Sequence, residues 1–486
     1  MKQKRVFVGV MGLALLPLAA SAQIHQDVSN STATVVRDPA RQASTDVDAV
    51  LFNPAGTVFL DNGWHLSLNG KLAYQNFNLG DNRNSIEKSM VDHIPSLQAA
   101  YKTGAWAFSF SIGNEGGYGA WASSEDAYLT NTLTNFHKQL FDLYKEAMRP
   151  YANSCSLFDQ LDSKVMVSGN LYNYSVRVGA AYQINSHLSA SVGLRLNYVT
   201  EKTKVNLLNR VLTTNGSVES PNDYFSAVND EFQQSMQKIR DEASIPEEEL
   251  NAIINGALGD YVNQEMAKTP DFKSLIDERT NGWGITPVIG VDYNINNFNF
   301  AAKYEFETKI HPQGSALSYH LPGVFSLGAS WQVTDDFQVA VGGNLHHQKS
   351  NSMYGREQSI VYPVLSESGS SKFYQRNDGG VASGDFSASV SFSPIKRLLF
   401  SVGYTCAYQA PMYKSFYSQS IASAIDNNSY PATHIVSGGL RYEINDKVQF
   451  DFGVSHKASV GERHDTFNSL DNYRGMSMSA GINVNL

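Results

Sequence analysis

The last eleven residues, Met476-Ser477-Met478-Ser479-Ala480-Gly481-Ile482-Asn483-Val484-Asn485-Leu486, place an apolar side chain at every second position. The residues between them are small or polar. Successive side chains of a β-strand point to opposite faces, so this segment predicts a strand with one apolar and one polar face. Such a strand fits a wall between an apolar phase and a wet or packed interior.

The same alternation recurs along the chain, for example in residues 107–112, 386–392 and 448–454. About fourteen such segments can be drawn, and their connections alternate between short and long, which is typical of an antiparallel barrel that spans a bacterial outer membrane. A single segment of this kind also fits the edge strand of a soluble sandwich. The short connections are rich in turn-forming residues: Lys102-Thr103-Gly104, Asn185-Ser186-His187, Asn294-Ile295-Asn296-Asn297, Thr334-Asp335-Asp336, Ser393-Pro394-Ile395-Lys396 and Asn445-Asp446-Lys447.

Composition agrees with a barrel. The mean hydropathy is -0.29 and 42% of the residues are hydrophobic, values that exclude a helical membrane protein but fit strands that are apolar at alternate positions. The 25 Tyr and 25 Phe would supply aromatic girdles at the two membrane interfaces. A net charge of -9 favours neither nucleic acid nor an anionic membrane surface as a partner.

The N-terminus carries an export signal. Lys2, Lys4 and Arg5 precede an apolar run, and Ala20-Ser21-Ala22 forms a cleavage signal, so residues 1–22 are predicted to be a signal peptide. The only cysteines, Cys155 and Cys406, both fall on the side assigned as extracellular; the sequence allows either a disulfide or two free thiols.

Three stretches resemble one family. Asp48-Ala49-Val50-Leu51-Phe52-Asn53-Pro54-Ala55-Gly56 is similar to the N-terminal hatch motif of the long-chain fatty-acid transporter family, FadL, and its aromatic-hydrocarbon-transporting relatives. Residues 321–336 resemble that family's Leu-Pro strand and Thr-Asp hairpin, and residues 430–446 resemble its late strand pair. The outer loops do not match, and Leu486 replaces the usual terminal aromatic residue.

The resemblance implies an all-β fold: a fourteen-stranded barrel over residues 64–486, with an N-terminal hatch over residues 23–63 that contains Asn53, Pro54, Ala55 and Gly56. It implies passive uptake of hydrophobic small molecules such as long-chain fatty acids, which are captured outside and released when the hatch moves. The family's third strand carries an inward kink that opens the wall sideways. Here Gly113, Gly116 and Gly117 lie in the third strand and could form such a kink, or the strand could end there in a flexible loop.

Two outer loops, at about 120–166 and 205–282, show helical periodicity. In the first, apolar residues recur at spacings of three and four and place Phe136, Leu140, Phe141 and Tyr144 on one face. These stripes could pack against each other as a small external core. They could also line an apolar groove that receives the ligand, as the family's outer helices do, and both can hold.

Alternation assigns a set of charged residues to the barrel interior, because an Arg or Lys facing lipid at the midplane would cost about 2–4 kcal/mol. Opposite charges could pair there, and Arg177, Arg195 or Lys303 could hold a ligand carboxylate. The set is Arg177, Arg195, Asp292, Lys303, Glu305, Arg441, Glu443 and Asp451.

Other function classes are less well supported. No nucleophile motif accompanies the histidines, and no metal spacing or phosphate loop is found, so we expect neither catalysis nor a cofactor or metal. The alternatives are a polar-solute porin and a structural or adhesive barrel. The sequence thus predicts a monomeric barrel in the outer membrane, partnered by membrane lipid and a hydrophobic ligand and not by nucleic acid. Residues 120–166, 205–282, 350–380 and 411–430 should face the exterior.

Overall fold

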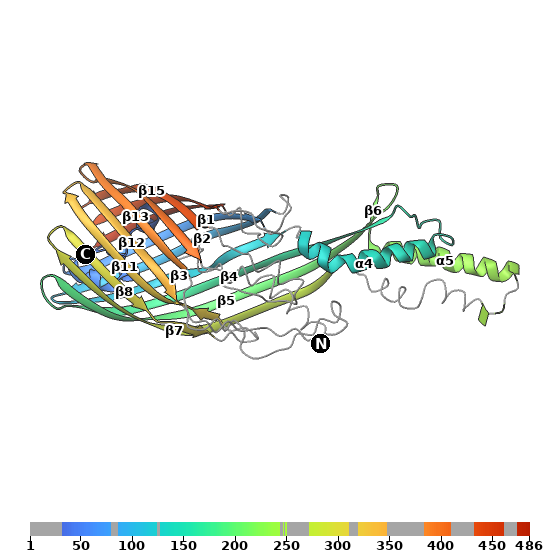
Figure 1. Cartoon of the computed structure of the whole chain (residues 1–486), viewed down its shortest axis with the longest axis horizontal. Coiled ribbons are helices and arrows are strands. Elements are labelled where there is room, and N and C mark those ends of the chain that lie inside the picture. Colours follow the sequence, from blue (N-terminus) through green and yellow to red (C-terminus); the bar gives the residue numbers. More distant parts are fainter. Residues whose placement is uncertain are drawn as a thin grey trace.

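The computed structural model describes residues 32–78, 86–123, 127–243, 246, 248–249, 272–310, 319–347, 383–409, 432–460 and 474–486. Fourteen of the described strands pair antiparallel, each with the next around the sheet, and β17 (Arg474–Asn485) pairs with β1 (Gly63–Asn78). The sheet is therefore a closed barrel (Figure 1), which confirms the predicted fold class. The strands between them are β2 (Ile86–Thr103), β3 (Trp106–Ser123), β4 (Gln160–Gln183), β5 (Leu188–Leu212), β7 (Phe272–Ile295), β8 (Phe298–Glu305), β11 (Gly323–Thr334), β12 (Phe337–His347), β13 (Ser383–Ile395), β14 (Leu398–Gln409), β15 (Ala432–Asn445) and β16 (Val448–Val460).

The two ends of the barrel differ in their connections. Strand pairs such as β2–β3 and β15–β16 are joined at one end by two-residue turns, at the positions that the sequence predicted. The described parts of the long connections, which include α4 (Ala127–Met148) and α5 (Pro221–Ala243), lie at the other end. The predicted signal peptide and the predicted outer loops 350–380 and 411–430 fall outside the described residues.

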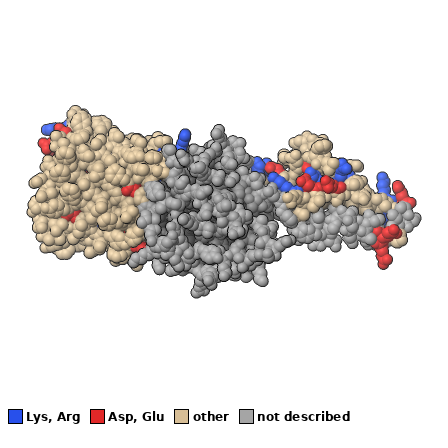
Figure 2. Space-filling view, viewed as in Figure 1, with Lys and Arg blue, Asp and Glu red and all other residues tan. Residues whose placement is uncertain are grey.

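The two faces of the wall follow the predicted alternation. In β17, Met476, Met478 and Ile482 are exposed on the outer face, whereas Ser477 and Ser479 are buried on the inner face. Figure 2 shows a flank of the barrel that is mostly uncharged, with charged side chains gathered at one end and over the helical extension. This polarity, apolar outside and polar inside, suits a wall whose outer solvent is lipid.

Three neighbouring strands extend well beyond the rest. β4, β5 and β7 have 24, 25 and 24 residues, whereas β8 has eight. Their far ends carry the helices α4 and α5, which extend away from the barrel (Figure 1). Two short hairpin elements complete the described strands: β6 (Val218–Glu219), which pairs with β5, and β9 (Thr308–Ile310), which pairs with β10 (Tyr319–Leu321). No helix in the described part of the chain is long and apolar enough to cross a membrane.

Candidate functional site

The segment from Thr32 to Leu60 lies inside the barrel. It forms α2 (Ala33–Arg37), α3 (Ala49–Phe52) and a 3-10 helix, η2 (Pro54–Phe59), and nearly all of its side chains are buried. It makes hydrogen bonds to strands on opposite sides of the barrel, for example to a backbone carbonyl of β7 and to a carboxylate of β16. We call it the N-terminal plug.

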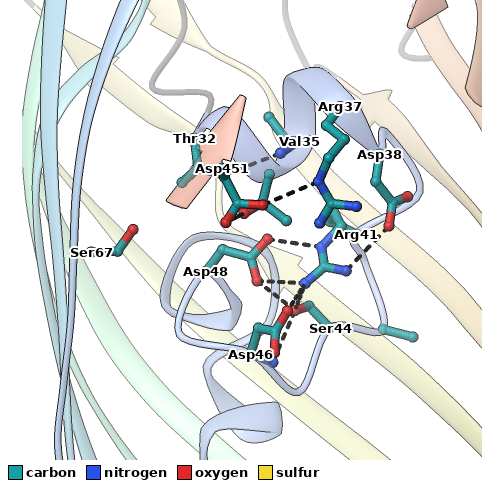
Figure 3. A network of polar contacts seen from close by, with 12 residues as sticks. Thr32, Val35, Arg37, Asp38, Arg41, Ser44, Asp46, Asp48, Ser67 and Asp451 are labelled. Carbon is teal, nitrogen blue, oxygen red and sulfur yellow. Dashed lines mark hydrogen bonds and ion pairs between the residues drawn. The ribbon is translucent and has the colours of Figure 1, made fainter. Parts of the chain in front are cut away.

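The plug is held together by Arg41. The Arg41 guanidinium donates to both carboxylate oxygens of Asp48, at 2.8 and 2.9 Å, and contacts Asp46 at 2.9 Å and Asp38 at 3.3 Å (Figure 3). The Ser44 hydroxyl donates to Asp48 at 2.5 Å. Such a bidentate pair fixes geometry as well as charge, so residues 38–48 form a compact loop.

A second network ties this loop to the wall. Arg37 of the plug lies 3.1 Å from Asp451 on β16, and Arg441 on β15 joins Asp451 to Asp46 with contacts of 3.1 Å on each side. Arg37 also donates to the Ser401 hydroxyl on β14. Removing one partner of a buried ion pair costs about 3–5 kcal/mol, because the other charge is left unpaired. This side of the plug is therefore strongly anchored.

The wall is shaped to receive the plug by inward-facing glycines on six different strands. A Cβ at Gly453 would lie 2.6 Å from the backbone nitrogen of Arg37, and one at Gly328 would lie 2.6 Å from the Cβ of Gln42. The plug approaches the sheet so closely that only hydrogen fits between them. The six are Gly290, Gly328, Gly342, Gly403, Gly453 and Gly481. At Gly481 the nearest atom is Oδ1 of Asn69 on β1, which accepts from Ala33 N of the plug, and the Cβ of Ala33 follows at 3.3 Å. This cradle was not predicted from the sequence.

Each residue of the Asn53-Pro54-Ala55-Gly56 motif has a structural role. The Asn53 side chain accepts from Ala55 N at 3.3 Å, which caps η2, and donates to the carbonyl of Val291 on β7 at 2.8 Å. Pro54 begins η2, where its missing N–H costs nothing. A Cβ at Gly56 would clash with the Ser44 carbonyl. The motif thus turns the chain tightly and joins it to β7.

The three cations proposed for a ligand carboxylate come together beside the plug. Arg177 pairs with Glu115 at 2.7 Å and with Glu305 at 2.9 Å; Arg195 and Lys303 each lie 2.6 Å from Glu305. Arg177 and Lys303 also donate to the Leu51 carbonyl of the plug, at 3.4 and 3.3 Å. Three cations face two carboxylates, so the cluster carries one uncompensated positive charge if all five groups are ionised.

One donor of this cluster has no partner. The Arg195 Nε is buried and makes no hydrogen bond in the described part of the chain. Buried donors are nearly always satisfied, so this atom marks a place where a further acceptor would be favourable.

The three glycines proposed for a kink lie within a continuous β3. Gly113 pairs regularly with Ser175 of β4, while the register with β4 shifts between Asn114 and Gly116 and again after Gly117. Toward β2 the pairing is interrupted: no residue of β3 between Ile112 and Trp121 pairs with β2 in the described structure, and pairing resumes at Trp121. A Cβ at Gly116 would meet no atom within 4 Å. The strand neither ends nor stays regular here, and the wall has lost one row of hydrogen bonds.

Glu115, which was not among the charged residues predicted to face the interior, lies in the first of these register shifts. Its carboxylate accepts from Arg177 Nε at 2.8 Å and from the Ser175 hydroxyl at 3.1 Å. A register shift displaces the alternation of inward and outward side chains, which hides such a residue from pattern analysis. Glu115 joins the irregular part of β3 to the charged cluster beside the plug.

The outer helices form their own core. Leu140, Phe141 and Tyr144 of α4 are buried against α5, with Tyr144 in edge contact with Phe225 at 5.2 Å. The side chain of Phe136 lies outside the described part. These three residues therefore agree with the interpretation in which the apolar stripes of the two outer loops pack against each other. A ligand groove at Phe136, Leu140, Phe141 and Tyr144 stays a prediction, and it would require the helices to separate.

The two cysteines do not pair. Cys155 is buried in the core between the helices, Cys406 lies on β14, and both thiols are free. The alternative of a disulfide is thus not realised in this structure.

A closed barrel with an apolar outer face and an enclosed N-terminal plug defines the class: a transmembrane β-barrel. No family model and no curated protein sequence matches the chain. Among solved structures, the Pseudomonas putida toluene transporter TodX matches with a TM-score of 0.51 at 13% identity, covering 94% of this chain and 98% of that one. The CymD monoaromatic hydrocarbon channel matches with a TM-score of 0.50 at 11% identity, covering 94% and 99%.

A Pseudomonas aeruginosa FadL homologue matches with a TM-score of 0.50 at 11% identity, covering 92% of this chain and 98% of that one. The chain therefore has the fold of the FadL and aromatic-hydrocarbon channels over nearly its whole length, which confirms the resemblance at the level of fold.

Proposed function

We propose that this protein is an outer-membrane channel for the passive uptake of hydrophobic small molecules. The observation that carries the proposal is the interruption of the pairing between β2 and β3, from Ile112 to Trp121 of β3, beside a lumen that contains the plug. The related folds include channels for monoaromatic hydrocarbons and a toluene transporter. An apolar ligand gains about 25 cal/mol for each Å² of apolar surface kept from water, so an exit through the wall into lipid is favoured over one into the periplasm.

The plug would release the ligand by moving only in part. Residues 37–48 are anchored by ion pairs, whereas residues 53–55 are held to the β5 and β7 wall by neutral hydrogen bonds, from Asn53 to the Val291 carbonyl and from Ser189 to the Ala55 carbonyl. A neutral hydrogen bond contributes about 0.5–1.5 kcal/mol net. The part with the Asn-Pro motif is therefore the part that can shift at low cost.

For a ligand that bears a carboxylate, the cluster of Arg177, Arg195 and Lys303 would hold the head group. Its excess positive charge and the free Arg195 Nε support this role. An uncharged hydrocarbon would pass the cluster without such a contact. A contact between the ligand and this cluster would therefore favour long-chain fatty acids as the substrate over aromatic hydrocarbons.

Substitution at Gly116 tests the sideways exit. A Cβ there meets open space, so Gly116→Trp should leave the barrel folded while filling the opening between β2 and β3. We expect uptake of a radiolabelled hydrophobic substrate by intact cells to fall at least tenfold at equal surface abundance. Ala388→Trp, which adds the same side chain to the outer face of β13, is the control and should transport normally. Normal uptake by Gly116→Trp would contradict the sideways exit.

The two alternative functions are separated by simpler measurements. A polar-solute porin needs an open lumen, and rapid swelling of proteoliposomes in small sugars would favour it over a plugged channel. An adhesive barrel would bind its partner through its loops. Deleting the tip of the outer part formed by α4 and α5, which we call the head, would then abolish adhesion. We expect slow sugar flux, because the plug fills the barrel from β7 to β16.

A further inference from the structure

The outer faces of β4, β5 and β7 carry rows of side chains that lie in register. Tyr174 on β4 is opposite Tyr198 on β5, which is opposite Trp283 on β7, with the last two rings 4.4 Å apart. Trp283 is 61% exposed. On the turn side of this row the outward residues are apolar, for example Leu194 and Leu196. A row of Tyr and Trp above an apolar band marks the outer boundary of the hydrocarbon region.

Two basic residues face each other beyond this aromatic row. Lys202 on β5 is directly opposite Arg279 on β7, four residues farther along each strand from Tyr198 and Trp283. Both lie on the outer face, because the register between the two strands is regular over this span. In the next outward position, Lys204 is paired with Asp277 at 3.4 Å. The surface thus changes from aromatic to basic within two rows.

Among the residues that the structure describes, Lys202 and Arg279 have no partner of opposite charge. Within the described part of the chain neither makes an ion pair or a side-chain hydrogen bond, although Asp277 is only one row away and is bound to Lys204. Like charges directly opposite on two strands destabilise a sheet. An anion from outside the chain would reduce the repulsion between Lys202 and Arg279.

The height of the pair identifies the source of that anion. Four residues correspond to about 13 Å along a strand, or about 10 Å along the membrane normal for a typical strand tilt. The pair therefore lies at or just above the headgroup level of the outer leaflet. In outer membranes this leaflet is built from glycolipids whose headgroups carry phosphates. Arg binds phosphate in a bidentate manner and Lys binds it as a point charge.

We propose that Lys202 and Arg279 bind a phosphate of an outer-leaflet glycolipid whose acyl chains lie on the wall below the aromatic row. The ligand would neutralise the opposed charges and fix the height of the long strands relative to the membrane surface. The inference depends on placement in an outer membrane but not on transport, so it can fail while the channel function holds.

Lipid binding to the purified full-length protein tests the proposal. The probe is lipid A, a glycolipid with two phosphates, added to the protein in a neutral detergent and followed by native mass spectrometry. We expect a retained adduct with the unmodified protein and at least tenfold weaker binding for the double variant Lys202→Gln, Arg279→Gln, since each basic residue near a charged lipid surface contributes about fivefold. The charge-preserving Lys202→Arg, Arg279→Lys variant should bind.

The control removes the same charge at the other end of the barrel. Lys396→Gln, Arg397→Gln changes two exposed residues of the turn between β13 and β14 and should bind lipid A normally. Equal loss in this control, or no loss in the Lys202, Arg279 variant, would overturn the site. Equal binding of lipid A stripped of its phosphates would overturn the phosphate contact. An adduct of comparable affinity with inorganic phosphate alone would overturn the lipid as its source.

Discussion

Gly453 on β16 allows the plug to pack closely against the wall because it has no side chain. A Cβ at this position would lie 2.6 Å from Arg37 N and 2.9 Å from the Ala33 carbonyl oxygen, both backbone atoms that move only with α2. Gly453→Ala should therefore push the plug from the wall and lower the free energy of unfolding by about 1–3 kcal/mol, as overpacking does. Urea titration of the folded barrel in detergent measures this.

Gly438 on β15 provides the matched control. Its nearest contact for an added Cβ is the Ser401 carbonyl oxygen at 3.4 Å, an ordinary van der Waals distance. Gly438→Ala should change the free energy of unfolding by less than about 0.5 kcal/mol. Equal destabilisation by the two alanines would mean that close approach of the plug is not what requires glycine at position 453.

At the scale of elements, α4 and α5 form a core independent of the barrel interior. Phe141 packs on Tyr224 with ring centroids 5.7 Å apart, and Phe232 and Cys155 are buried in the same cluster. The Tyr224 hydroxyl donates to Asp159 at 2.8 Å, which fixes the loop after α4 against α5. Helices of this length acquire most of their stability from such packing rather than from propensity.

The reactivity of Cys155 reports on this core. Burial raises the pKa of the Cys155 thiol, so the thiolate fraction at neutral pH is smaller than for a free cysteine, and reaction with a maleimide should be slow in a Cys406→Ser background. The labelling rate, followed by mass, should rise with pH. Phe232→Ala, which opens a cavity at a cost of about 3–5 kcal/mol, should accelerate it. Labelling at the rate of a free thiol in the intact head would contradict the packed core.

Sequence patterns predicted some elements better than others, for physical reasons. The alternation in β17 is a local property, and its inward and outward residues agree with the prediction. The fit of the plug depends on contacts between residues more than 400 positions apart, such as Arg37 and Asp451, and no local pattern encodes them. Glu115 was missed because the register shift in β3 interrupts the alternation on which the assignment of interior charges depended.

At the scale of the whole molecule, the two ends of the barrel differ, and this difference predicts its orientation in the membrane. The tight turns gather at one end and the α4–α5 head at the other (Figure 1). We expect the head to face the exterior, so an epitope inserted at the exposed turn around Gly216 should be labelled on intact cells. One inserted at Ser186 should be labelled only after permeabilisation. Labelling of the Ser186 insertion on intact cells would reverse the topology.

The glycine cradle has a consequence for the order in which the chain folds. The plug is synthesised before any of the strands, yet the six glycines that receive it begin at Gly290 and end at Gly481, on strands synthesised later. The last of them lies on β17, whose pairing with β1 closes the ring. Contacts between such distant parts of a chain form slowly. We therefore expect the plug to reach its place in the barrel late, when β17 pairs with β1 and closes the ring.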